Sequence, residues 1–144
     1  MSSFTVDANV WFAALQPRDK HHFASIAFLR RLFTAGHTAV APEILLVEIA
    51  CALSRRHGDP QAAIEGVRRV SAHSSLHLDP LSGPRLVRAT ALGAQFRIRG
   101  ADAIYASTAD SLKAPLVSWD AELCERAGAI TPAQFLDQRL DDSA

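Results

Sequence analysis

The chain is predicted to fold as one α/β domain, residues 1–144, with a parallel sheet covered by helices on both faces. Short apolar segments rich in strand formers alternate with helical segments along the whole sequence. No hairpin signal such as Asn-Gly joins two strands, which favours crossover connections and parallel pairing. The 144 residues, 49% of them hydrophobic, suffice for one core, and no linker, repeat or low-complexity segment divides them.

The first strand is predicted over Phe4–Val6, where β-propensity is high, and it ends at a carboxylate. Residues 8–15 are mostly apolar and predict one or two helical turns. A polar loop with Pro17 separates them from an amphipathic helix over residues 23–35, which Gly36 ends. Four residues of this helix fall near helical spacing and are expected to form its apolar face: Phe23, Ile26, Ala27 and Phe33.

A second strand is expected over residues 38–41, stopped by Pro42. Pro42 also suits the first turn of the next helix, which is predicted to continue to Arg56, before a glycine. Asp59-Pro60 then provides a cap and a proline start for a helix over residues 61–72. A minimal third strand is predicted over residues 76–78.

The last third of the chain continues the alternation. After a turn over residues 79–84, a helix over 85–96 is expected to bury Leu86, Val87, Ala89 and Leu92. An alanine-rich helix over 101–112 and a strand over 115–118 follow. The remaining elements are a short helix over 121–127, a short strand over 128–130 and a terminal helix capped by Thr131-Pro132.

Composition excludes several classes of function. The formal net charge is zero, so no global basic field indicates a polyanion partner, although a local basic face would suffice. Cys51 and Cys124 lie far apart and are interpreted as small buried hydrophobes. No apolar run approaches the roughly 20 residues of a membrane helix, and no signal-peptide pattern opens the chain, so a cytoplasmic location is the expectation.

Four carboxylates stand where ordinary surface charges would not be expected. Asp7 and Asp120 each follow a predicted strand, and Asp102 begins an alanine-rich helix. Glu48 shares a helix face with Leu45, Ile49 and Ala52, where an unpaired charge costs roughly several kcal/mol. Local roles remain open: Glu48 could meet an arginine, Asp102 suits a first helical turn, and Asp120 could cap the next helix.

Because the carboxyl ends of parallel strands share one edge, these four acids can meet there. Together and unpaired they would repel, and a divalent cation removes the conflict. Hard oxygen ligands suit Mg²⁺ or Mn²⁺, ions that activate water for phosphodiester hydrolysis. No rival catalytic set exists, since the six histidines, including the loop pair His21-His22, lack metal-ligand spacing and no Gly-rich phosphate loop is present.

With these positions in hand, the chain resembles the PIN-domain nucleases and, within them, the toxins of VapBC-type toxin–antitoxin pairs. Four segments carry the resemblance, in matching order and spacing over nearly the whole chain: Val6-Asp7-Ala8-Asn9-Val10, Pro42-Glu43-Ile44-Leu45-Leu46-Val47-Glu48, Ile98-Arg99-Gly100-Ala101-Asp102-Ala103-Ile104-Tyr105-Ala106 and Leu116-Val117-Ser118-Trp119-Asp120.

The resemblance implies a three-layer α/β/α fold and a Mg²⁺- or Mn²⁺-dependent endoribonuclease, the toxin of a type II toxin–antitoxin system. It also implies an RNA substrate, a homodimer and an antitoxin that inserts a segment into the active-site groove.

The implied site residues are the metal-binding and catalytic acids Asp7, Glu48 and Asp102, the more variable Asp120, and the supporting residues Asn9 and Ser118. Trp119 departs from many relatives, and core packing is its favoured role. Arg97 and Arg99 could hold RNA phosphates or be solvated or Glu-paired surface charges.

Three alternative functions are compatible with parts of the sequence pattern. A phospho-receiver domain needs an acid pair near the first strand and a lysine after a later one, whereas Asp7 has no acidic neighbour and Lys113 precedes its strand. An RNA-processing PIN nuclease without an antitoxin, and a non-catalytic binding module with the same fold, both remain open from the sequence.

Overall fold

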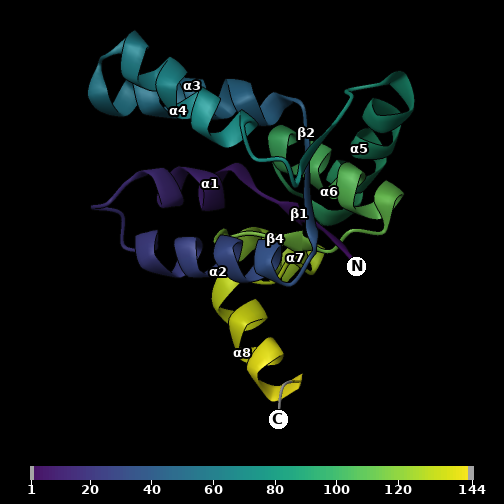
Figure 1. Ribbon diagram of the computed structural model, residues 1–144. Helices are drawn as coiled ribbons and strands as arrows, with labels where there is room; N and C mark the ends of the chain where they lie inside the picture. The colour runs from purple at the N-terminus through teal and green to yellow at the C-terminus, as the bar shows by residue number, and fades with distance from the viewer. Residues whose placement is uncertain (1, 143–144) are drawn as a thin grey trace.

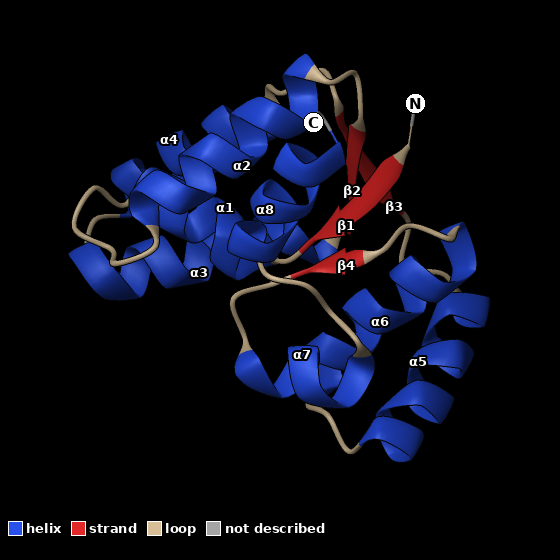
Figure 2. Cartoon of the chain, turned by 90° about the horizontal axis from the view of Figure 1, so that it is seen from below, coloured by secondary structure: helices blue, strands red, loops and turns tan. Residues whose placement is uncertain are grey.

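The computed structural model describes residues 2–142 as a four-stranded parallel sheet with helices on both faces (Figures 1 and 2). The strands are β1 (Ser3–Val6), β2 (Thr38–Pro42), β3 (Leu76–Asp79) and β4 (Leu116–Val117). The helices are α1 (Ala8–Leu15), α2 (His22–Thr34), α3 (Ile44–His57), α4 (Pro60–Ser71), α5 (Gly83–Phe96), α6 (Gly100–Leu112), α7 (Ala121–Ala127) and α8 (Pro132–Asp142). The predicted α/β/α class is therefore confirmed.

The sheet has the strand order β3-β2-β1-β4, with every pairing parallel. Figure 2 shows α1–α4 and α8 on one side of it and α5–α7 on the other. Because the strands are parallel, their carboxyl ends lie at one edge, where β1 passes into α1 and β4 into the segment before α7. The final predicted strand, residues 128–130, is reduced to a single bridge between Val117 and Ile130.

The core is built on both faces of β1, whose Val6 is fully buried, and is continuous with apolar residues of α1, α2 and α3. Three residues predicted to be buried are exposed instead: Phe23 (81%), Val87 (73%) and Leu86 (44%). α2 buries Phe28, Leu29 and Leu32, and Phe23 in its first turn lies off that stripe.

Other local predictions can be judged directly. Asp59 caps α4, accepting a hydrogen bond from the Gln61 backbone N–H at 3.0 Å, as predicted. The interpretation of Cys51 as buried is wrong, because it lies on the outward face of α3, one turn after the exposed Val47. Within the described range no helix is long and apolar enough to span a bilayer.

The segment predicted as a turn from residue 79 instead begins with a buried ion pair. Asp79 ends β3 and is 6% exposed. Its carboxylate accepts from Arg85 Nε at 2.8 Å and Nη2 at 3.2 Å, and from the Thr108 hydroxyl at 3.3 Å. This pair joins β3, α5 and α6.

Candidate functional site

A pocket of about 310 Å³ lies at the carboxyl end of β1, beside the first turns of α1 and α6. It gathers all four acids singled out in the sequence, together with Asn9 and Arg99. Its lining comprises Asp7, Ala8, Asn9, Phe12, Glu48, Ile49, Ala52, Arg99, Asp102 and Asp120. Segments more than 100 residues apart thus contribute carboxylates to one hollow.

Asp7 lies deepest in this pocket and is 6% exposed. It is the N-cap of α1, where Oδ1 accepts from the Ala8 backbone N–H at 2.7 Å, and Oδ2 accepts from the Ser118 hydroxyl at 2.7 Å. Burial raises its pKa from 3.8 to about 7, with smaller contributions from the charges of Asp102 and Glu48, against the lowering effect of the Ser118 hydrogen bond. No cation of the described chain compensates Asp7.

Ser118 is fully buried and organises the polar groups beneath the pocket. Besides donating to Asp7, its oxygen accepts from Asn9 Nδ2 and from the Asp120 backbone N–H, both at 3.0 Å. Asn9 Oδ1 in turn accepts from the Trp119 backbone N–H at 3.2 Å. The supporting positions predicted for Asn9 and Ser118 therefore tie the end of β4 to the start of α1.

Glu48 approaches the pocket from α3, half-buried. Its Oε1 is buried and has no hydrogen-bond partner among the described residues, and the same is true of the Tyr105 hydroxyl. Burial raises the pKa of Glu48, the Asp102 charge adds to the rise, and the nearby Tyr105 hydroxyl opposes it. The alternative that Glu48 meets an arginine is not observed within the described part of the chain.

Arg99 spans the other two acids. Its Nε donates to Asp102 Oδ2 at 3.1 Å, and its Nη2 donates to Asp120 Oδ2. Burial raises the pKa of Asp102, and the Arg99 guanidinium opposes that rise. Asp120 also caps α7 by accepting from the Leu123 backbone N–H at 3.1 Å, so its local role and its place in the pocket coexist.

Arg97, predicted beside Arg99, does not line the pocket. It ends α5 in the left-handed conformation (φ 57°), and its carbonyl accepts from Arg126 Nη1 at 2.6 Å. Only Ile98 separates the two arginines, and the helix break between α5 and α6 directs them to different surroundings. Position in the sequence alone did not distinguish them.

The donor set fits a hard divalent cation by its chemistry. Carboxylate oxygens surround the pocket, Glu48 Oε1 is buried without a partner, and the acids raise one another's pKa values. Among the side chains of residues 2–138, however, no three His, Cys, Asp or Glu converge closely enough to ligate one ion as they stand. Shared use of Asp102 and Asp120 by Arg99 accounts for part of that spread.

The burial of Asp7 makes a pH-dependent stability effect measurable without any metal. Since the folded pKa of about 7 lies above the unfolded 3.8, the fold favours the protonated acid, and stability falls as pH rises from about 4 through 7. The full difference corresponds to about 4 kcal/mol. We expect Asp7→Asn to be more stable than the parent at pH 8 and close to it at pH 4, by urea unfolding in EDTA. An equal stability difference at both pH values would contradict the burial-raised pKa.

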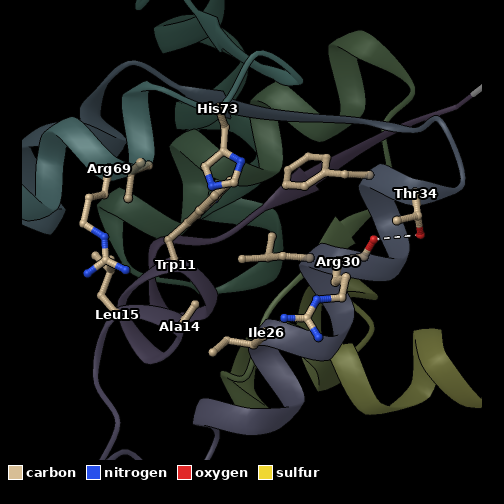
Figure 3. A pocket seen from close by; sticks show the side chains of 11 residues that line it. Trp11, Ala14, Leu15, Ile26, Arg30, Thr34, Arg69 and His73 are labelled. Atoms are coloured by element: carbon tan, nitrogen blue, oxygen red, sulfur yellow. Dashed lines mark hydrogen bonds between the residues drawn. The ribbon is translucent and has the colours of Figure 1, made fainter.

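A larger hollow of about 530 Å³ lies between α1, α2 and α4 (Figure 3). It is mostly apolar, with Trp11, Leu29 and Phe33 in its walls and Arg30 and Arg69 at its rim. No Asp, Glu or Cys lines it. The four acids singled out in the sequence line the smaller pocket instead. Sequence reasoning did not assign a role to Tyr105, which shares a face of α6 with Asp102 at i, i+3 spacing.

Comparison with known proteins gives a consistent picture. The PIN domain family model matches residues 4–129. No curated protein matches the sequence. Among solved structures, the fold is similar to Mycobacterium tuberculosis VapC20, described as a Sarcin-Ricin loop cleaving toxin, with TM-score 0.73 and 18% identity over 90% of this chain and 97% of that one.

Two further structures share the fold. VapBC2 from Rickettsia felis, bound to a DNA fragment from its promoter, matches with TM-score 0.69 and 18% identity over 90% of this chain and 96% of that one. A toxin–antitoxin complex from Klebsiella pneumoniae matches with TM-score 0.63 and 17% identity over 92% and 98%. At these identities the likeness is one of fold.

Proposed function

The chain belongs to the PIN domain family, and from this premise we propose that it is a divalent-metal-dependent endoribonuclease. The observation that carries the proposal is the pocket in which Asp7, Glu48, Asp102 and Asp120 converge from four separate segments. Two of these acids, Asp7 and Glu48, have no arginine or lysine partner among the described residues. Such a buried, uncompensated cluster suits a cation better than it suits stability.

Asp7, Glu48, Asp102 and Asp120 would hold Mg²⁺ or Mn²⁺, directly or through water. When bound, the ion would supply an activated water and would stabilise negative charge on the phosphoryl group. The chain's own contribution is to fix and isolate the ligands. Ser118 orients the Asp7 carboxylate by donating to Oδ2 at 2.7 Å, and the wall of Phe12, Ile49 and Ala52 limits access of bulk water.

Arg99 gives the site a cation of its own when no metal is present. It lies at the rim with a side chain 68% exposed, and it neutralises Asp102 and Asp120. Release of these acids to a metal would leave the guanidinium beside the pocket, where it could contact an RNA phosphate. This role for Arg99 keeps the substrate-binding assignment made from the sequence, and the corresponding assignment of Arg97 receives no support from the structure.

The biological role that fits best is that of a toxin in a type II toxin–antitoxin pair, with a protein antitoxin as partner and a homodimer as the assembly. The support is the likeness in fold to the VapC20 toxin and to complexes that include an antitoxin. These structures match about nine-tenths of this chain and nearly all of their own chains.

The activity is tested by incubating the purified protein with total cellular RNA and with synthetic single-stranded RNA. Cleavage is expected with Mg²⁺ or Mn²⁺, none in EDTA, and recovery when the metal is restored in excess. Cleavage that is undiminished in EDTA would contradict a metal-dependent mechanism. Absence of cleavage with either metal on every RNA would instead support the non-catalytic binding module.

A further inference from the structure

The connection between α1 and α2 contacts Trp119, the residue before Asp120 of the acidic pocket, and it is not used by the proposed chemistry. We propose that His21, Phe23 and Trp119, here called the aromatic patch, bind the bases of single-stranded RNA next to the pocket. This inference rests on the proposed function for the choice of RNA as the ligand. It adds a base-binding surface to a site whose acids and arginine can recognise only the backbone.

The first observation is a tight stack between two rings. His21 and Trp119 lie with their ring centroids 3.8 Å apart and their planes within 5°. The His21 backbone N–H donates to Asp19 Oδ1 at 2.8 Å, and Trp119 Nε1 donates to Ser25 Oγ at 2.8 Å. The Trp119 hydrogen bond and the stack itself therefore hold the two rings together before any ligand arrives, which lowers the ordering cost of binding.

The second observation is the character of the surrounding surface. Phe23 is 81% exposed, an unusual state for a phenylalanine in the first turn of a helix. Arg18 and Lys20 in the same connection are exposed, and neither forms an ion pair with a carboxylate of the described chain. Aromatic faces interleaved with cations are the composition that single-stranded nucleic acids require.

The third observation is the link from the patch to the acids. The Trp119 backbone N–H donates to Asn9, Asn9 donates to Ser118, and Ser118 donates to Asp7. α1, which separates Asp7 from the loop, has eight residues and is about 12 Å long. A few nucleotides of single strand span that length, so one RNA could reach both places.

Packing against the core accounts for only one face of the Trp119 ring, because His21 stacks on the other. Trp119 packs against the core as a partly buried side chain, and its Nε1 donates to Ser25 in the first turn of α2. The stacked imidazole on its other face has no further ring partner in residues 2–138. One base could extend the stack on His21, and another could stack on the exposed Phe23 two residues further along the chain, with Arg18 and Lys20 near the phosphates.

The test measures binding in EDTA, where the proposed cleavage cannot occur, by fluorescence anisotropy of a short labelled single-stranded RNA of mixed sequence. His21→Ala and Phe23→Ala are each expected to weaken binding by roughly 5- to 100-fold, the range for one lost base stack. His21→Phe, which keeps a flat ring, is expected to bind within about threefold of the parent. Replacing both Arg18 and Lys20 by alanine is expected to reduce the slope of log K against log salt by about 1.4.

Val87→Ala on α5 is the matched control, because it removes a side chain of similar exposure (73%) on the opposite side of the sheet. Parent-like affinity in both His21→Ala and Phe23→Ala, with circular dichroism showing intact folds, would overturn the proposal and leave the patch to a protein partner. Equal weakening of duplex RNA binding would also overturn it, since paired bases cannot stack on a side chain. A protein that binds RNA through the patch yet never cleaves it would contradict the proposed activity alone.

Discussion

Replacing Asp7 or Asp102 by asparagine is expected to reduce metal-dependent RNA cleavage by roughly 10³-fold or more. Asparagine keeps the shape of each side chain but offers a neutral oxygen in place of a carboxylate, which lowers affinity for a hard cation. Asp7→Asn keeps an acceptor for the Ser118 hydroxyl, and at pH 8 it is expected to be more stable than the parent. Lost activity in this variant therefore could not be attributed to unfolding. Initial rates at saturating Mn²⁺ provide the measurement.

Asp110→Asn supplies the control on the same helix. Asp110 lies two turns after Asp102 on α6, is partly exposed and pairs with Arg88 away from the acidic pocket. Its replacement is expected to leave the cleavage rate within about twofold of the parent, as for a surface change distant from the site. Ser118→Ala is expected to fall between, with a loss of roughly 10- to 100-fold, since it removes the hydroxyl that orients Asp7 but leaves all four acids in place. Full activity in Asp7→Asn or Asp102→Asn would defeat the assignment.

The acidic pocket could be predicted from the sequence because three of its four acids stand at unusual positions. A carboxylate on the apolar stripe of α3 and carboxylates at two strand ends are anomalies visible in the sequence, and parallel pairing brings such positions to one edge. The same reasoning located nearly every helix and strand to within two residues. The order of the strands in the sheet could not be predicted, because the sequence of a short strand does not specify which strands it pairs with.

Contacts between individual side chains could not be predicted from the sequence either. An arginine bridging Asp102 and Asp120 depends on the angle between α6 and the start of α7, which no periodicity encodes. The exposure of Phe23 could not be foreseen either, because the helical spacing of α2 is compatible with two neighbouring stripes. For Asp79, the turn-like composition of the following residues concealed that the strand end itself is buried.

The second large effect concerns Asp79, and it is one of stability. Asp79→Ala is expected to lower the free energy of unfolding by roughly 3–5 kcal/mol, the usual cost of removing one partner from a buried ion pair. The side chains of Asp79 and Arg85 are 9% and 23% exposed, so Arg85 would keep its charge in a poorly solvated place. The Thr108 hydroxyl would lose its acceptor as well. Urea unfolding in EDTA at constant pH measures the change without a contribution from bound metal.

The neighbouring ion pair between Arg88 and Asp110 is a control that distinguishes the effect of burial on stability from the effect of charge. It also involves an arginine of α5 at 2.8 Å from an aspartate, but the two side chains are 47% and 41% exposed. Asp110→Ala is therefore expected to cost less than about 1 kcal/mol. Removing Arg85 along with Asp79 should recover part of the loss, because the isolated charge disappears with it. Equally small losses of stability in Asp79→Ala and Asp110→Ala would contradict this prediction. The buried Asp79–Arg85 pair would then not be what holds α5 and α6 against the sheet. Another interaction would have to keep α6 rigid where it presents Asp102 to the acidic pocket.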